Sequence, residues 1–343
     1  MSLPHQTPAR KPLRALLYAP FVAVLLLALA WSAGWFWLRG DVLRRMDTAR
    51  TAWRAAGHDL GWTARTLSGF PFRLDLDLSD ARMGDGSGWA ISTPRLNAEA
   101  FVFSPSHWVL VAPGAVTITR RSAGPVIVHA KVLRASLSDF AARPLRLSVE
   151  GLALTFDAPP GEKPFLLASA AEFHLHTRAG PDDQCALYLG LENAAPAHGG
   201  ALERVAAGQS VNLTLDGLYD HAAAMRGRDW PDSLQAWKAA GGAFNLRLLK
   251  IEAGGASLEA RSGHASAGAD GRLRGSILAQ IKGAPGLLSA LGAGGALSLE
   301  AAHAATMIVG LDRRGPAVRT TLDFEAGRMT LGPVALGPAP RIY

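Results

Sequence analysis

The sequence predicts a mainly β fold: a long antiparallel meander whose curved sheet forms a groove, a sandwich or an open barrel, with a few short helices and one N-terminal transmembrane helix. Three observations support this prediction. Apolar and polar residues alternate with a period of two along many segments, as in half-buried strands. These segments recur about every ten residues with turn residues between them. Alternating strands and helices with a Gly-rich phosphate loop are absent, which makes a nucleotide-dependent enzyme an unfavourable interpretation.

The N-terminal segment predicts a membrane-spanning helix over residues 15–38. These 24 residues carry no charge, and as a helix they extend about 36 Å, enough to cross a hydrocarbon core of roughly 30 Å. Trp31, Trp35 and Trp37 lie near the end of this run, where indoles favour the headgroup boundary. A cleaved signal peptide is the alternative, since residues 28–30 (Ala-Leu-Ala) resemble a cleavage site. The apolar run continues beyond them and favours a retained anchor.

The rest of the chain divides around this anchor. The predicted parts are a cytoplasmic tail (1–14), a juxtamembrane amphipathic helix (39–57) and a periplasmic antiparallel β-domain (58–343). Basic residues flank the apolar run equally on both sides, so their count does not orient the anchor. A long domain translocates largely regardless of its charge. We therefore expect the tail in the cytoplasm, the anchor in the inner membrane and the bulk of the chain in the periplasm.

The positive charge is concentrated near the anchor. The net charge is +7, and the residues up to Arg54 include eight basic and only two acidic side chains, so the remainder is nearly neutral. No basic domain is left that could follow a phosphate backbone, and we expect no nucleic-acid partner. Arg39, Arg44 and Arg45 are predicted instead to lie at the membrane surface, where they would attract anionic headgroups.

The helix and hairpin after the anchor follow from their periodicity. Val42, Met46 and Trp53 share one face of a helix predicted over residues 41–56, and Gly57 ends it. From Phe70 the period changes to two. The apolar face of this first strand, and of its partner beyond the Gly-rich turn at residues 84–88, carries the predicted lipid-facing side chains Phe70, Phe72, Leu74, Leu76, Leu78, Leu96 and Val102.

Further strands follow at short intervals. In the first half they are predicted at residues 108–111, 116–120, 126–133, 145–149, 152–156, 172–177, 186–191 and 211–215. A helix with Asp232 as its N-cap is predicted over residues 233–240, ended by Gly241-Gly242. Beyond it we predict strands at residues 244–252, 256–267, 272–282, 296–307, 317–326 and 328–334, with one helical turn at 287–291.

Few residues suggest chemistry. Glu172, His174 and His176 alternate along a strand at metal-ligand spacing, but no second group of ligands accompanies them, so we interpret them as a solvated strand face and predict no metal site. Cys185 is the only cysteine. It begins an apolar segment, which favours a place in the core. We predict no catalytic residue and no cofactor.

The apolar strand faces raise the question of what covers them, because only a few short helices are available. A sheet that folds on itself as a sandwich or barrel would bury them. A curved sheet with an open concave face would instead receive acyl chains, each buried methylene contributing about 0.8 kcal/mol. The sequence alone leaves both answers open.

Several segments resemble one bacterial family across nearly the whole chain. They are the short basic tail and anchor, residues 69–74 (Gly-Phe-Pro-Phe-Arg-Leu), Trp237 before Gly241-Gly242, residues 270–275 (Asp-Gly-Arg-Leu-Arg-Gly) and the closing 327–340 stretch. They resemble the family of domain of unknown function 2125, and the most specific of them is residues 332–340. This resemblance implies a location and an architecture but no reaction. A weaker, fold-level similarity to AsmA-like envelope proteins, whose long sheets form lipid-associated grooves, is an analogy.

Three functions remain as hypotheses. The first is a membrane-anchored periplasmic protein that binds or hands over a lipid or other amphiphile in envelope biogenesis, with membrane lipid and envelope proteins as partners. The second is a closed, non-catalytic structural or protein-interaction module of the envelope. The third is a metal-dependent hydrolase that uses Glu172, His174 and His176.

Overall fold

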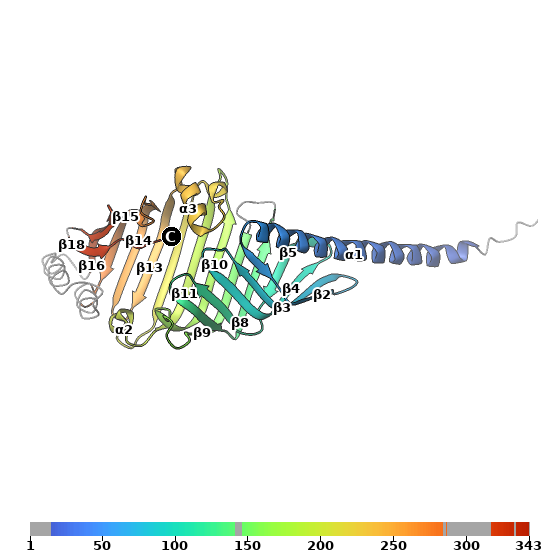
Figure 1. Cartoon of the computed structure of the whole chain (residues 1–343), viewed down its shortest axis with the longest axis horizontal. Coiled ribbons are helices and arrows are strands. Elements are labelled where there is room, and N and C mark those ends of the chain that lie inside the picture. Colours follow the sequence, from blue (N-terminus) through green and yellow to red (C-terminus); the bar gives the residue numbers. More distant parts are fainter. Residues whose placement is uncertain (1–14, 141–145, 284–285, 287–316, 333, 343) are drawn as a thin grey trace, which may run out of the picture.

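The computed structural model describes residues 15–140, 146–283, 286, 317–332 and 334–342. Within these residues the chain forms one antiparallel sheet of 18 strands, three α-helices and one 3-10 turn. The sheet is elongated, and α1 (Ala15–Ala55) lies along one end of it and then extends beyond it (Figure 1). The predicted class, a mainly β protein with a long antiparallel meander and an N-terminal apolar helix, is confirmed.

The sheet has a first part, β1 to β8, with strands of 3 to 12 residues, and a second part, β9 to β18, with strands of 4 to 13 residues. In the first part they are β1 (Asp59–Gly61), β2 (Ala64–Ser68), β3 (Arg73–Gly84), β4 (Ala90–Phe101), β5 (Ser104–Val111), β6 (Val116–Arg120), β7 (Gly124–His129) and β8 (Val132–Ser138). The second part contains β9 (Arg146–Asp157), β10 (Leu167–Ala179), β11 (Cys185–Pro196), β12 (Val211–Tyr219), β13 (Phe244–Ala253), β14 (Ala256–Ala267), β15 (Leu273–Lys282), β16 (Ala317–Glu325), β17 (Arg328–Leu331) and β18 (Val334–Pro338).

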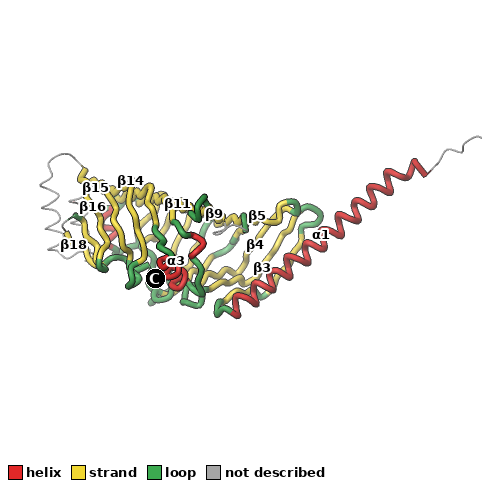
Figure 2. The backbone as a smooth tube through the Cα atoms, turned by 90° about the horizontal axis from the view of Figure 1, so that it is seen from above, coloured by secondary structure: helices red, strands yellow, loops and turns green. Residues whose placement is uncertain are grey.

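The pairing follows the chain. From β9 to β18 each strand pairs with the next one along the sequence. Before β9 one long strand pairs with two shorter ones. Strands β5 and β6 pair with different halves of β4, and β8 and β7 pair with different halves of β9. Register shifts occur in several ladders, including β12 with β13 and β14 with β15. Such bulges bend strands and increase twist, and the sheet is visibly curved (Figure 2).

Helix α1 is continuous, although the sequence predicted two separate helices, over residues 15–38 and 41–56. Gly40 is the only weak helix former between them, and the Asp41 carboxylate accepts hydrogen bonds from Arg44 and Arg45, one turn further along the helix. With 41 residues α1 is about 62 Å long. It contains a stretch long and apolar enough to cross a membrane. Its second half packs on the sheet through Trp35, and Val42 and Met46 add to this contact.

Two shorter helices connect strands. Helix α2 (Ala201–Ala206) joins β11 to β12, and α3 (Trp230–Ala239), preceded by the 3-10 turn η1 (Ala222–Ala224), joins β12 to β13. The N-cap of α3 is Asp229, whose carboxylate accepts a hydrogen bond from the Asp232 backbone amide at 2.9 Å. The prediction of Asp232 as N-cap was therefore wrong by one turn. Pro231 in the first turn lets the helix begin earlier.

Several other strand boundaries also differ from prediction. The strand predicted at 126–133 is divided into β7 and β8, and those predicted at 145–149 and 152–156 form the single strand β9. Phe70 and Phe72 precede β3 instead of belonging to it, because Gly69 has a positive φ of 100° and the Arg73 amide donates to the Gly69 carbonyl, closing a turn. The cytoplasmic tail, the strand at 296–307 and the helical turn at 287–291 lie outside the described residues.

Candidate functional site

One face of the sheet is apolar over almost its whole width, and the register shows this directly. Residues paired across antiparallel strands point to the same side. The central row of such pairs consists of Leu67, Leu76, Ala98, Leu110, Ala135, Val149, Leu175, Leu189, Leu215, Leu249, Ala260, Ala279 and Thr320. Only the last member of this row is polar.

Two flanking rows have the same character. One consists of Leu133, Gly151, Phe173, Leu191, Leu213, Ile251, Leu258, Ile281 and Val318. The other consists of Trp108, Leu137, Leu147, Thr177, Leu187, Gly217, Leu246, Gly263, Ile277, Leu322 and Leu331. We call the surface formed by these three rows the apolar face.

The opposite face is polar. A row there, one residue out of step with the central row, consists of Arg134, Glu150, His174, Gly190, Thr214, Lys250, Glu259, Gln280 and Arg319. Ion pairs stabilise this side, such as Arg134 with Glu150 and Lys250 with Glu252, the latter at 2.8 Å. The sheet is thus two-sided, with one face suited to water and the other to apolar material.

Helix α1 covers the apolar face at the β2–β5 end. Leu74, Leu76 and Leu78 are at most 9% exposed and share a cluster with Trp35. The Trp35 indole NH donates to the Arg73 carbonyl at 2.9 Å, which fixes the helix on the sheet. These three predicted lipid-facing leucines therefore contact the protein's own helix. Leu96 and Val102 are partly buried against the same cluster, whereas Phe70 and Phe72 are exposed in the turn between β2 and β3.

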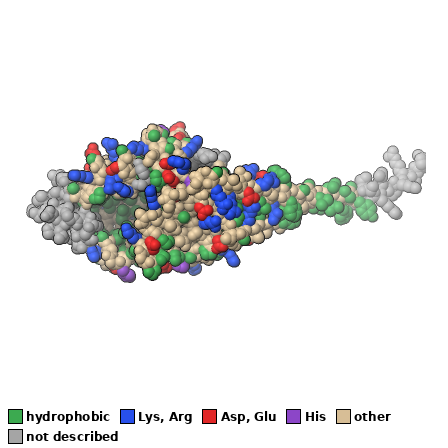
Figure 3. Space-filling model, in the orientation of Figure 1, with side chains coloured by type: hydrophobic (Ala, Val, Ile, Leu, Met, Phe, Trp, Pro, Cys, Tyr) green, Lys and Arg blue, Asp and Glu red, His purple; other side chains and the backbone are tan. Residues whose placement is uncertain are grey.

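The middle of the apolar face is more open. In the central row every side chain from Leu110 on β5 to Leu249 on β13 is partly exposed, whereas Ala98 before them and Ala260 after them are buried. Helix α2 packs on the flanking row here, since Ala206 and Leu191 belong to the same buried cluster. A hollow with hydrophobic side chains is visible over the β13 region, on the side of the molecule from which Figure 1 is viewed (Figure 3). The alternating pattern predicted these strands, but no lipid-facing side chain was predicted on them, because the alignment of their apolar residues depends on register.

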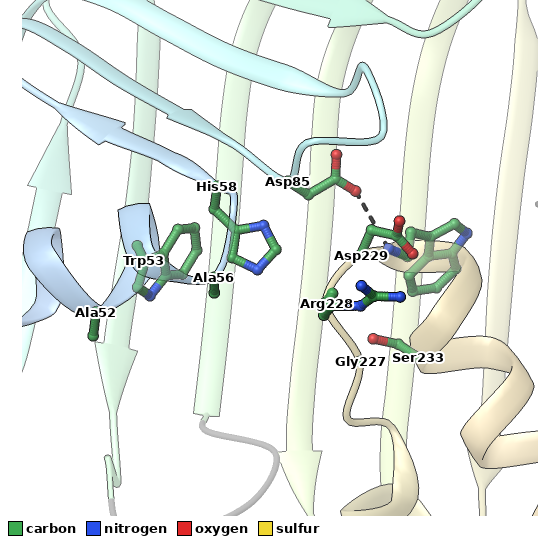
Figure 4. A pocket seen from close by; sticks show the side chains of 10 residues that line it. Ala52, Trp53, Ala56, His58, Asp85, Gly227, Arg228, Asp229 and Ser233 are labelled. Carbon is green, nitrogen blue, oxygen red and sulfur yellow. Dashed lines mark hydrogen bonds between the residues drawn. The ribbon is translucent and has the colours of Figure 1, made fainter.

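A cleft of about 500 Å³ lies between the end of α1 and the start of α3 (Figure 4). Trp53 and His58 form one wall, with their rings 5.4 Å apart, and Trp230 and Arg228 form another. The Asp85 carboxylate accepts a hydrogen bond from the Trp230 amide at 3.3 Å, which ties the β3–β4 turn to α3. Burial disfavours the charged form of Asp85, but hydrogen bonds from Ser87 and Trp230 outweigh it and lower the pKa.

The three residues at metal-ligand spacing lie on the polar face of β10. The Glu172 carboxylate is 3.2 Å from Nε2 of His174, while Nδ1 of His176 is 2.7 Å from the Ser148 hydroxyl. The His174 and His176 rings stack with centroids 6.2 Å apart, so they run parallel instead of converging on one point. Among the described residues no three His, Cys, Asp or Glu side chains are placed to hold a metal ion. The arrangement of Glu172, His174 and His176 therefore gives the metal-dependent hydrolase no support.

Cys185 lies in the core, as predicted, and is fully buried. Its thiol donates to the neighbouring Ala186 carbonyl at 3.3 Å. Burial, together with the neighbouring Cys185, raises the pKa of Tyr219 well above its ordinary value. Cys185 on β11 lies directly opposite Tyr219 on β12, so the two residues contribute to the packing between these strands.

The arginines predicted at the membrane surface lie just beyond the apolar run of α1. Arg39 donates to the Leu67 carbonyl at 3.0 Å and so fastens α1 to β2. Arg44 and Arg45 both pair with Asp41, at 3.0 and 2.7 Å, and their own side chains are largely exposed. Arg44 and Arg45 can therefore reach outward from the helix.

The comparisons with known proteins give a family but no activity. Residues 35–340 match the family described as "Uncharacterized protein conserved in bacteria (DUF2125)". No curated protein and no solved structure matches the chain. The expected fold-level similarity to AsmA-like envelope proteins therefore has no support from the comparisons.

Proposed function

The chain belongs to the DUF2125 family, uncharacterized proteins conserved in bacteria, and on that premise we propose that it is a membrane-anchored protein whose apolar face holds the acyl chains of a lipid or similar amphiphile. One observation supports this proposal most strongly. The central row of the apolar face runs across the sheet with aliphatic side chains and stays partly exposed from Leu110 to Leu249. An apolar surface of this extent on a soluble domain usually marks a binding site.

The physical chemistry of the face suits acyl chains better than a compact polar ligand. No charged residue belongs to the three rows, so a headgroup would have to stay at their rim, in water. Each methylene that leaves water on such a surface contributes about 0.8 kcal/mol, and a chain of a dozen carbons gains roughly 10 kcal/mol before ordering costs. The opposite side of the sheet carries ion pairs and is suited to contact with water.

The setting proposed for this function is the inner membrane of a Gram-negative cell. Helix α1 would be its single membrane span, with the residues before it in the cytoplasm and the sheet in the periplasm. A role in envelope biogenesis, in which a lipid is held or handed over, would follow from that position. The proposal assigns no catalytic residue.

Photo-crosslinking tests the proposal on the full-length chain. The protein would be reconstituted in nanodiscs that contain a phospholipid with a diazirine in its acyl chain, irradiated, digested and mapped by mass spectrometry. We expect labelled peptides from the apolar face of β10 to β13, around Leu175, Leu189 and Leu215. Labelling confined to α1 would overturn the proposal and favour the alternative, a structural or protein-interaction module, which protein crosslinks in the same membranes would then support.

A further inference from the structure

We propose that two hairpin tips of the sheet, residues 69–72 between β2 and β3 and residues 101–103 at the end of β4 and in the turn to β5, are immersed in the same membrane leaflet from which α1 emerges. This inference rests on α1 being the membrane anchor, which is part of the proposed function. It does not depend on lipid binding by the apolar face.

The first observation is that both tips lie beside the part of α1 that leaves the sheet (Figure 1). The Trp31 indole NH donates to the Pro71 carbonyl at 2.9 Å, and the Trp31 and Phe72 rings are 6.1 Å apart. Phe36 stacks on Phe70 with a centroid distance of 6.2 Å. The second tip is joined to the first, since the Val102 amide donates to the Phe72 carbonyl at 3.0 Å.

The second observation is depth. The uncharged run of α1 continues to Leu38, and Trp31 lies seven residues before that point, which is about 10 Å along the helix axis. A tip that contacts Trp31 is therefore held below the level at which charge begins on α1. The apolar run is about 36 Å long and a hydrocarbon core is roughly 30 Å thick. The tips beside Trp31 are therefore expected in the headgroup and outer acyl region.

The third observation is the chemistry of the tips. Phe70, Phe72, Phe101 and Phe103 are all more than half exposed, as is Trp37 on the adjacent turn of α1. Charged residues are absent from 69–72 and from 100–106. Exposed aromatic rings with no charge among them, placed next to a membrane span, form the kind of belt that anchors proteins at the bilayer interface.

The backbone of the tips is also suited to a medium with little water. The Arg73 amide donates to the Gly69 carbonyl at 2.8 Å, and Phe101 pairs with Ser104 across the second tip. An immersed turn must satisfy its polar backbone groups within the protein, because lipid tails cannot. Arg73, at the base of the first tip, forms ion pairs with Asp75 and Glu99, so charge returns one residue beyond the aromatic rings.

Site-directed spin labelling of the full-length chain in phosphatidylglycerol and phosphatidylethanolamine nanodiscs tests this inference. Single cysteines would replace Phe72 and Phe103 in a Cys185→Ala background, and the accessibility of each label to oxygen and to a water-soluble nickel chelate would be measured. Trp89→Cys is the matched control, an exposed aromatic residue in the turn at the opposite end of β3 and β4. Leu25→Cys reports on the anchor itself.

We expect the labels at positions 25, 72 and 103 to be accessible to oxygen and shielded from nickel, and the label at position 89 to be open to nickel. Nickel access at 72 and 103, with position 25 still shielded, would overturn the inference while leaving the anchor intact. Shielding of the tips from both reagents would also overturn it and indicate protein contact. Nickel access at position 25 would instead remove the anchor and the inference together. If Phe72→Cys fails to fold, Phe103→Cys decides alone, since the Phe103 side chain is 72% exposed and its ring stacks on Phe101 at the same tip.

Discussion

The apolar face has one strongly covered region and one open region, although both are built from the same alternating pattern. At the β2–β5 end α1 lies across the face, and Leu76 of the central row is only 7% exposed. Between β10 and β13, Leu175, Leu189 and Leu215 occupy equivalent positions and remain partly exposed. The covering helix accounts for the burial at the β2–β5 end. An alternating strand therefore indicates where a face is apolar, and the helices that the chain supplies determine which part of that face is available to another molecule.

The largest expected effect on stability is in the covered region. Leu74→Ala leaves a cavity beneath α1 and should lower the free energy of unfolding by about 2–5 kcal/mol. Leu189→Ala, the matched change in the open region, should cost much less, because its side chain already contacts solvent. Urea unfolding of both variants in the same detergent measures the difference. Equal losses would mean that the open region is covered as firmly as the other.

A charge in the open region should affect lipid more than folding. We expect Leu189→Glu to remove most acyl-chain crosslinking while the protein still folds, since a partly exposed carboxylate keeps much of its hydration. The control is Thr214→Glu on the neighbouring strand, which points to the polar face beside Lys250. Crosslinking yield and circular dichroism are the measurements. Undiminished labelling of Leu189→Glu would show that the open region does not hold the chains.

The hydrogen bond from the Trp230 amide to Asp85, which ties the β3–β4 turn to α3, should make the stability of the fold depend on pH. The hydrogen bonds that Asp85 accepts lower its pKa below the ordinary value of 3.8, so it stabilises the fold above that value and loses this contribution as the pH falls through the lowered pKa. Asp85→Asn should therefore show a smaller loss of stability than the wild type between about pH 5 and pH 2. Urea midpoints across this range test it. Parallel curves for the two proteins would contradict the assignment.

The smallest effect is expected on the polar face. Arg261 donates to Glu259 at 2.7 Å, but its side chain is 79% exposed. Arg261→Ala should change the free energy of unfolding by about 0–1 kcal/mol, as is typical of a solvated ion pair. The same urea experiment provides the measurement. A loss as large as that of Leu74→Ala would show that this face, too, packs against something.

Local pattern predicted much of this fold, whereas long-range contacts limited the rest. The period-two alternation predicted β14 with its observed bounds, Ala256–Ala267, and the turn at 84–88 predicted the β3–β4 hairpin. The alternation misled at Phe70 and Phe72, because a turn can continue the same spacing. That α1 would cover Leu74, Leu76 and Leu78 depends on residues about 40 positions away, such as Trp35. The apolar face depends on the register of a dozen strands, which no single strand encodes.

Helix α1 is continuous, which makes it a rigid connection between the segment proposed to span the membrane and the sheet. Since α1 is helical throughout from the exposed Phe21 to the buried Trp35, rotation of the proposed membrane span would rotate the whole sheet by the same angle. One residue inserted at Gly34 would turn the two parts by about 100° and separate them by about 1.5 Å. The number of residues in α1 therefore sets the direction in which the apolar face of the sheet points around the helix axis.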